Sequence, residues 1–278
     1  MKLLEIKNLK MHINTYEGIV KAVDGVDLTI NKGEIVGIVG ESGSGKSTIG
    51  NAILNVLRLT APDVSITGKI NLVLEDEEVD LLGLPRKLMK NYREYIQMIF
   101  QDPYSSLNPR MLVKDIIKEP LDINTNLSLS EKNDKIDWLL NKVGLTSEQS
   151  NRYPHEFSGG QRQRIGIARS LATDPEVIIA DEPVSALDVS IQAQIINLMM
   201  DLQEDLNLSI IFIAHDLSVV KHISNRVGVM CDGELVEVKE TDDIFANPEH
   251  DYTIELLRAI PKPNPEGREE RKRSRLGM

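Results

Sequence analysis

The stretch Gly40-Glu41-Ser42-Gly43-Ser44-Gly45-Lys46-Ser47 decides the fold of this chain. It follows residues 35–39, a continuously apolar run that is typical of a strand buried on both faces. Behind it, apolar residues recur at helical spacing, namely Ile49, Ala52, Ile53, Val56 and Leu57. Glycines in such a loop let backbone N–H groups surround an anion, and the positive end of the following helix points at the same place. The sequence therefore predicts a strand, a phosphate-binding loop and a helix.

The pattern G-x-x-x-x-G-K-S also assigns chemistry to its last two residues. Lys46 is expected to reach the β- and γ-phosphates of a nucleotide, and Ser47 is expected to bind Mg²⁺. A flexible Gly/Ser turn is the alternative interpretation, and the flanking strand and helix argue against it.

Composition limits the class of protein. The chain has 278 residues, of which 41% are hydrophobic, so it can bury a substantial core. Its formal net charge of -11 argues against nucleic acid as a partner, because nucleic-acid binding relies on clustered Lys and Arg. The single cysteine, Cys231, cannot form an intramolecular disulfide. No apolar run reaches the ~18 residues of a membrane span, and the N-terminus lacks a signal peptide's apolar stretch, so we expect a cytoplasmic protein.

Strand signals are spread over the whole chain. Residues 3–13 and 22–30 alternate between apolar and polar side chains, as strands do. Residues 177–180 and 210–214 are continuously apolar, and a helical pattern separates them. Buried strands that alternate with helices predict an α/β fold with a largely parallel sheet.

Other segments depart from this alternation. The segment 103–157 begins irregularly and then shows a helical stripe, so it predicts a helical insertion in the core. Apolar runs flank Asp232-Gly233, a strong signal for a hairpin turn. The tail from Pro261 is rich in Pro, Glu and Arg, and we expect it to be loosely ordered.

Two acidic residues end the apolar run at 177–180. Asp181 and Glu182 lie at a strand end, where both side chains can approach the phosphate loop. We expect Asp181 to hold Mg²⁺ through its water shell and Glu182 to act as general base on the attacking water. An ordinary acidic loop is the alternative, and it is disfavoured by the phosphate loop elsewhere in the chain.

Ser158-Gly159-Gly160-Gln161 opens another helix, and its glycine-rich N-terminus is a second anion site. One nucleotide does not need two such sites, so this one is expected to face the γ-phosphate held by another molecule. A simple Ser-capped helix start is the alternative.

Two single polar residues also have candidate roles. Gln101 sits where the core meets the helical insertion, and its amide could bind Mg²⁺ or contact the attacking water. His215 follows the run 210–214, and its imidazole could hydrogen-bond the γ-phosphate and orient Glu182. Without the other motifs a lone Gln carries no information, and a structural core histidine is the alternative for His215.

Together these five motifs resemble those of the ATP-binding subunit of an ABC transporter. The phosphate loop matches the Walker A motif, and residues 177–182 match Walker B with its catalytic Glu. Residues 157–161 match the signature motif, Gln101 matches the Q-loop and His215 the H-loop. The match is specific because the motifs also occur in the order that the family has.

The resemblance implies that the cofactors are ATP and Mg²⁺. It implies Mg²⁺ binding by Ser47, Gln101 and Asp181, and catalysis by Glu182, His215 and Gln101. The residues that it assigns to nucleotide binding are Tyr16, Gly40, Glu41, Ser42, Gly43, Ser44, Gly45, Lys46, Ser47, Thr48, Ser158, Gly159, Gly160 and Gln161. Tyr16 is assigned from its position alone, which is about where the family places an aromatic ring on adenine.

A finer resemblance is to the oligopeptide, dipeptide and nickel importer subfamily. It is carried by residues 98–110, which read Met-Ile-Phe-Gln-Asp-Pro-Tyr-Ser-Ser-Leu-Asn-Pro-Arg, and by residues 153–157 and 247–253. The last segment has Asp251 where the usual His-Pro-Tyr-Thr has Pro. Some members carry a C-terminal cysteine cluster for iron–sulfur, which the one cysteine of this chain cannot supply.

The resemblance also implies a fold and an assembly. The fold is an α/β P-loop NTPase core of the ABC type, with an antiparallel β subdomain and a helical subdomain insertion. Two ATPase subunits, identical or paralogous, form a head-to-tail dimer in which each ATP lies between the Walker motifs of one and the signature of the other. This dimer binds two integral membrane permease subunits at the cytoplasmic face of the membrane, as a peripheral component. An extracytoplasmic substrate-binding protein delivers the solute.

The expected division of the chain has four parts. Residues 1–102 form the first part of the ATP-binding core with the N-terminal β subdomain, and residues 103–157 form the helical subdomain. Residues 158–240 contain the signature helix and the second part of the core. Residues 241–278 are a C-terminal extension of the peptide-importer type.

Other functions fit parts of the sequence. Nickel or another solute could be the cargo, because specificity belongs to other subunits. A soluble ABC ATPase of translation or DNA repair is less favoured, because such proteins usually carry two cassettes or long coiled coils. A non-enzymatic, nucleotide-gated scaffold is disfavoured by Glu182 and His215.

Overall fold

The computed structural model describes residues 1–16, 18–57, 63–75 and 77–259. Its strands are β1 Lys2–Thr15, β2 Gly18–Asn31, β3 Ile35–Val39, β4 Val64–Val73, β5 Glu78–Asp80, β6 Ile96–Ile99, β7 Val177–Asp181, β8 Ser209–Ala214, β9 Arg226–Cys231 and β10 Glu234–Glu240. Its helices are α1 Lys46–Ile53, α3 Arg86–Met89, α4 Val113–Asn124, α5 Leu129–Lys142, α6 Gly159–Ser170, α7 Val189–Leu206, α8 Leu217–Ile223, α9 Thr241–Ala246 and α10 Asp251–Arg258. Short 3-10 helices are η1 Lys90–Tyr92, η2 Ser147–Asn151 and η3 Pro154–Glu156.

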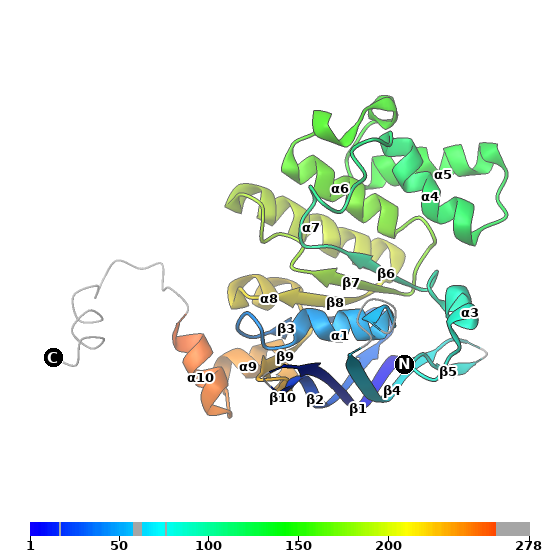
Figure 1. Ribbon diagram of the computed structural model, residues 1–278. Coiled ribbons are helices and arrows are strands. Elements are labelled where there is room, and N and C mark those ends of the chain that lie inside the picture. Colours follow the sequence, from blue (N-terminus) through cyan, green and yellow to red (C-terminus); the bar gives the residue numbers. More distant parts are fainter. Residues whose placement is uncertain (17, 58–62, 76, 260–278) are drawn as a thin grey trace, which may run out of the picture.

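These strands form two sheets (Figure 1). The first is antiparallel and has the strand order β2-β1-β4-β5. The second has the order β10-β9-β3-β8-β7-β6; its strands are parallel except for β10, which pairs antiparallel with β9. The sequence predictions of an antiparallel β part, a largely parallel sheet and a hairpin at Asp232-Gly233 are confirmed.

The parallel sheet is buried on both faces, which explains its continuously apolar strands. All residues of β3, β7 and β8 are buried. Successive side chains of β3 point to opposite faces, so Ile35 and Val39 enter one hydrophobic core while Val36 and Ile38 enter the other. The first core also includes residues of α6, α7 and α8, and the second includes α1 and the antiparallel sheet. The parallel sheet is therefore the layer between these two cores.

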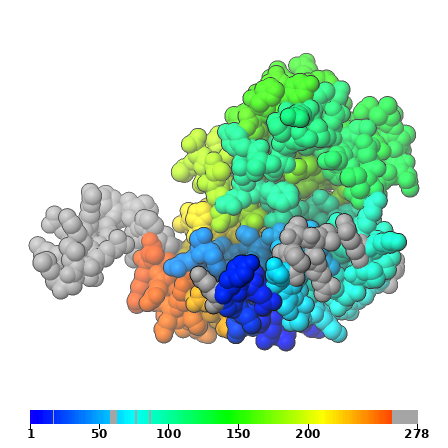
Figure 2. All heavy atoms as spheres, viewed as in Figure 1, coloured from blue at the N-terminus to red at the C-terminus, as the bar shows by residue number. Residues whose placement is uncertain are grey.

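The predicted insertion at 103–157 is helical and contains α4, α5, η2 and η3. In Figure 2 these green residues form a lobe above the blue residues of the antiparallel sheet. Among the described residues, no helix combines the length and the apolar character that a membrane crossing requires.

One prediction differs at an element boundary. The apolar stripe after the phosphate loop extends to Leu57, but α1 ends at Ile53. Asn55 has a left-handed backbone with φ of 50°, which stops a right-handed helix. Pro261 and the tail that follows lie outside the described residues.

Candidate nucleotide-binding site

Parallel pairing brings four of the five predicted motifs, all except the signature, to one edge of the sheet. Val39 of β3 pairs with Ala214 of β8, and Ile99 of β6 pairs with Ala180 of β7. The loops after these four strands therefore leave the sheet side by side, at its carboxyl edge. Those loops contain the phosphate loop, Gln101, Glu182 and His215.

The phosphate loop presents unsatisfied donors. A Cβ at Gly45 would lie 2.1 Å from the carbonyl oxygen of Ala22, so only glycine fits there. Helix α1 begins at Lys46 without a side-chain cap, which leaves the N–H groups of its first turn for another acceptor. Ser44 Oγ is buried without a hydrogen-bond partner among the described residues. These groups fit a bound phosphate.

Lys46 lies folded back on its own loop. Its Nζ donates hydrogen bonds to the carbonyl oxygens of Gly40 at 2.8 Å and Glu41 at 2.7 Å. Burial lowers the pKa of Lys46, and the charges of Glu182 and Asp181 act against that shift. The ammonium thus sits where the phosphate loop can present it to a ligand.

Ser47 and Asp181 form a direct hydrogen bond, in which the hydroxyl donates to Asp181 Oδ1 at 2.7 Å. Asp181 is buried, and burial raises its pKa, as does Glu182; the Ser47 hydrogen bond and the Lys46 charge lower it. A hydroxyl and a carboxylate are oxygen ligands of the kind that Mg²⁺ prefers. The structure brings together two of the three predicted Mg²⁺ residues, and the donor set fits the ion.

Glu182 is the meeting point of three loops. Its Oε2 accepts a hydrogen bond from Gln101 Nε2 at 2.9 Å, and His215 Nδ1 lies 3.3 Å from the same oxygen. The backbone of Glu182 has φ of 45°, a left-handed conformation that is strained for a residue with a side chain. Its N–H is fixed by the carbonyl oxygen of Ile213 at 2.9 Å. The fold therefore holds this carboxylate in a defined orientation.

A cavity of about 600 Å³ lies against the phosphate loop, Gln101 and Glu182; Asp181 and His215 are not among the described residues that line it. Its lining includes Gln101, Glu182 and the phosphate-loop residues Ser42, Gly43, Gly45, Lys46, Ser47 and Thr48. Residues 19–22 of β2 and the turn Asp232-Gly233 complete it. This volume and these donors suit a nucleotide-sized ligand.

The turn Asp232-Gly233 belongs to the site although its sequence predicted only a hairpin. The Gly233 N–H donates to the carbonyl oxygen of Ser44 at 3.1 Å, so the turn supports the phosphate loop. The pairing of β9 with β3 brings the end of β9 to this edge. The dipeptide predicts a hairpin turn, but it does not indicate which strand β9 pairs with. Residues 19–22 likewise carry no sequence signal that places them at the cavity.

The signature segment lies apart from this cavity. Ser158 caps α6 by accepting a hydrogen bond from the Gln161 N–H at 3.4 Å. Gly160 packs on α7 so closely that a Cβ would lie 2.5 Å from Ile191 Cγ2. Of the described residues that line the cavity, none belongs to 158–161. Within one chain the segment is thus a capped helix start, and its predicted contact with a second molecule stays a prediction.

Tyr16 is fully exposed next to the turn between β1 and β2. It does not line the described cavity, whereas Ile19 and Val20 on the same hairpin do. Its stacking on adenine also stays a prediction.

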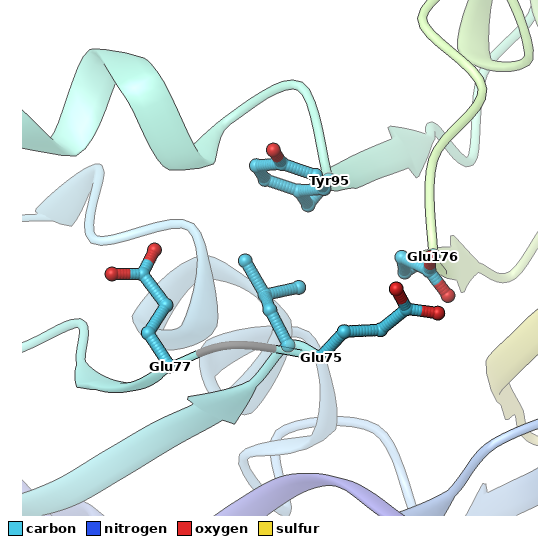
Figure 3. A pocket seen from close by; sticks show the side chains of 5 residues that line it. Glu75, Glu77, Tyr95 and Glu176 are labelled. Carbon is cyan, nitrogen blue, oxygen red and sulfur yellow. The ribbon is translucent and has the colours of Figure 1, made fainter.

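A second pocket lies at the opposite edge of the parallel sheet (Figure 3). Tyr95 precedes β6 and Glu176 precedes β7, so both lie at the amino ends of parallel strands. Glu75 and Glu77 complete its acidic lining. None of the predicted site residues is among the described residues that line it.

Comparison with known proteins identifies the family. Residues 23–185 match the family described as ABC transporter, which is more than half of the chain. The chain belongs to this family. Residues 236–276 match the family described as oligopeptide/dipeptide transporter, C-terminal region. This ABC ATPase therefore combines an ABC cassette with a C-terminal region of that second type.

Curated relatives cover nearly the whole ABC ATPase. The oligopeptide transport ATP-binding protein OppF of Bacillus subtilis is 55% identical over 95% of this chain and 84% of its own length. The dipeptide transport ATP-binding protein DppF of Escherichia coli is 49% identical over 97% of this chain and 79% of its own length.

Solved structures show the same fold. A dimeric, post-hydrolysis form of the ATP-binding cassette MJ0796 with ADP and Pi has a TM-score of 0.72 at 28% identity, over 86% of this chain and 99% of that one. The cbiO1 protein of Clostridium perfringens has a TM-score of 0.74 at 28% identity, over 88% of this chain and 91% of that one. The predicted ABC-type P-loop ATPase fold is confirmed.

Proposed function

We propose that this ABC ATPase hydrolyses ATP to power the import of oligopeptides or dipeptides. The observation that carries the proposal is the convergence of Gln101 and His215 on one oxygen of Glu182, beside the Ser47–Asp181 pair. Relatives at 49–55% identity are named as oligopeptide and dipeptide transport ATP-binding proteins, which supports the substrate class.

In this proposal Glu182 is the general base. A water molecule attacks the γ-phosphate and gives a proton to the Glu182 carboxylate, which lines the cavity. The bond between the γ-phosphorus and the β–γ bridging oxygen breaks, and ADP leaves. Gln101 and His215 contact that carboxylate, so its orientation is preorganised before the water molecule attacks. Donors of the phosphate loop and Lys46 stabilise charge on the phosphates. Tyr16 and Thr48 are proposed as further nucleotide contacts.

Ser47, Asp181 and Gln101 are the proposed Mg²⁺ residues. A bound Mg²⁺ would neutralise negative charge on the phosphates. Ser47 and Asp181 are already in hydrogen-bond contact, so both oxygens are placed to serve one ion directly or through water.

We further propose the head-to-tail dimer and the membrane assembly. The N-terminus of α6, with Ser158 to Gln161, lies outside the chain's own cavity and is suited to the γ-phosphate of a second ATPase subunit. The dimer acts on two permease subunits at the cytoplasmic face of the membrane, and a substrate-binding protein supplies the solute. The solved dimers of MJ0796 support the dimer part of this proposal.

The same proposal assigns the parts of the chain. Residues 1–102 and 158–240 form the ATP-binding core, residues 103–157 the helical part that contacts the permeases, and residues 241–278 the C-terminal extension. The helices α4 and α5 both lie within residues 103–157, which supports the assignment of this range as the helical part.

The test is to trap a Glu182→Gln variant with ATP in detergent-solubilised native membranes and to identify the proteins that co-purify. Two integral membrane proteins, with a peptide-binding protein or a second ATPase, would support the proposal. A Lys46→Ala, Glu182→Gln double variant is the matched control for nucleotide-dependent capture. If only ribosomal, repair or other soluble proteins co-purify, the transport function is overturned and the ATPase assignment remains.

A further inference from the structure

The C-terminal helix α10 contacts the phosphate loop directly. Tyr252, near its start, accepts a hydrogen bond at its Oη from the backbone N–H of Glu41 at 3.0 Å. The two residues are 211 positions apart in the chain. Burial raises the pKa of Tyr252, so the side chain stays a neutral hydroxyl at neutral pH. The proposed catalytic roles do not use this contact.

The contacted N–H shares a peptide group with the Gly40 carbonyl. That carbonyl accepts a hydrogen bond from Lys46 Nζ at 2.8 Å. A peptide group is planar and rigid, with its N–H and C=O pointing in opposite directions. Tyr252 therefore holds one end of the group whose other end holds Lys46. A Cβ at Gly40 would lie 2.1 Å from the Met230 carbonyl oxygen, so position 40 has no room for a side chain. A side chain at that position therefore cannot replace Tyr252 in fixing the peptide group.

The segment that carries Tyr252 is itself anchored to β10. The Glu237 carboxylate on β10 is nearly fully buried, and it accepts the N–H groups of Glu249 at 2.9 Å and His250 at 3.1 Å. Lys239 pairs with Glu237 at 3.0 Å and with Glu249 at 2.8 Å, so its ammonium joins the strand to the same segment. The start of α10 is therefore held against the sheet by hydrogen bonds and by charge.

The lowered pKa of Glu237 shows that its neighbours stabilise the ionised carboxylate. Burial acts to raise the pKa of Glu237, but the nearby Thr253 hydroxyl, the two backbone N–H groups and the Lys239 ammonium outweigh it and lower the pKa to about 2. At the start of α10, His250 Nδ1 accepts the N–H of Tyr252 at 3.2 Å. Tyr252 is thus held in place from its own segment as well as by the phosphate loop.

We propose that Tyr252 is a positioning residue for ATP binding, which acts by fixing the Gly40–Glu41 peptide and, through it, the phosphate loop around Lys46. The inference rests on the proposed nucleotide site. It gives a role to the segment 247–253, which carries part of the subfamily resemblance but had no assigned function. The C-terminal region thereby becomes part of the nucleotide site's support.

The test compares full-length Tyr252→Phe with the wild-type chain. This change removes the hydroxyl and keeps the ring that packs against the core. Since one neutral hydrogen bond is lost from a preorganised loop, we expect Mg²⁺–ATP to bind about 2- to 10-fold more weakly by titration calorimetry. In the assembled complex, KM for ATP should rise by a similar factor while kcat changes less than about 2-fold. Peptides that cover residues 40–46 should exchange amide hydrogens faster.

Two further variants separate the ways in which the proposal can fail. Tyr95→Phe removes the same group from the pocket at the opposite edge of the sheet (Figure 3) and should leave ATP binding unchanged. Lys46→Ala should lose ATP binding; if it does not, the proposed nucleotide site itself is wrong. If Lys46→Ala loses binding but Tyr252→Phe binds ATP as the wild type does or more tightly, the role of Tyr252 is overturned. A lower Tm of Tyr252→Phe with unchanged ATP affinity would also overturn it, because the bond would then be structural only.

Discussion

Glu182, the proposed general base, shows how the fold orients a single side chain. Its φ of 45° is unfavourable for a residue with a side chain, and such strain costs roughly 1–3 kcal/mol. The surrounding strands maintain it, since the Glu182 N–H is bonded to Ile213 of the neighbouring strand. The result is a carboxylate that Gln101 and His215 reach from two other loops.

The hydrogen bond between Ser47 and Asp181 leads to a prediction about Mg²⁺. Ser47→Ala removes the hydroxyl that meets Asp181 Oδ1. We expect the Mg²⁺ concentration for half-maximal ATP hydrolysis to rise about 10-fold or more, because lost ligands or their supporting groups weaken metal sites by about that factor. Magnesium titrations of phosphate release measure it.

Ser130→Ala, at an exposed position of α5, is the control and should keep the wild-type Mg²⁺ dependence. An unchanged Mg²⁺ requirement in Ser47→Ala would remove Ser47 from the metal site.

At the scale of elements, the buried Glu237 predicts how α10 is attached to β10. Glu237→Gln replaces a carboxylate that receives two backbone N–H groups and the Lys239 ammonium. Hydrogen bonds to charged groups contribute more than neutral ones, so we expect the free energy of unfolding to fall by about 2 kcal/mol at pH 7. Urea denaturation measures it.

The pH dependence of that difference follows from the lowered pKa. The folded-state pKa of Glu237 is about 2, below the ordinary 4.5, so its contribution is complete above pH 4.5 and is lost as the pH falls toward 2. The stability difference between wild type and Glu237→Gln should therefore be constant from pH 7 to about pH 5 and shrink below that. A difference that stays constant down to about pH 3 would show that the carboxylate charge is not what anchors the segment.

The elements were predictable where local patterns determine them. Buried strands such as 177–180 are marked by their apolar runs, and the phosphate loop by its glycines and Lys46. The end of α1 was missed, because the left-handed Asn55 interrupts a stripe that continues to Leu57.

Contacts between distant parts of the chain were not predictable from such patterns. The bond between Glu41 and Tyr252 spans 211 residues, and the turn Asp232-Gly233 reaches the site only through the pairing of β9 with β3. These contacts depend on strand order, which a motif at one end of the contact does not encode.

At the scale of the whole molecule, the separation of the signature from the cavity predicts a requirement for a second subunit. Ser158→Asp keeps an N-capping side chain but places a negative charge where a partner's γ-phosphate would lie. We expect ATP affinity of the single subunit to stay within about 2-fold, while ATP-dependent dimerisation and hydrolysis are lost. Size-exclusion chromatography and phosphate release measure the two effects.

Ser128→Asp is a matched control for this change. Ser128 caps α5 with the same φ of -65° and ψ of 164° and the same capping-box arrangement as Ser158. It should retain dimerisation and hydrolysis. If Ser158→Asp behaves as Ser128→Asp does, the helix start is only structural and the head-to-tail dimer is wrong.

The most direct test of the proposed chemistry measures phosphate release by the purified importer complex that carries Glu182→Gln in this subunit. The wild-type complex is measured under identical conditions, and bound ATP is quantified in both complexes. Because the amide cannot accept the proton of the attacking water, we expect hydrolysis at this subunit's site to fall by roughly 10²–10⁴-fold while ATP remains bound. Unchanged hydrolysis at this site with ATP bound would contradict the proposed mechanism, because Glu182 would then not be its general base.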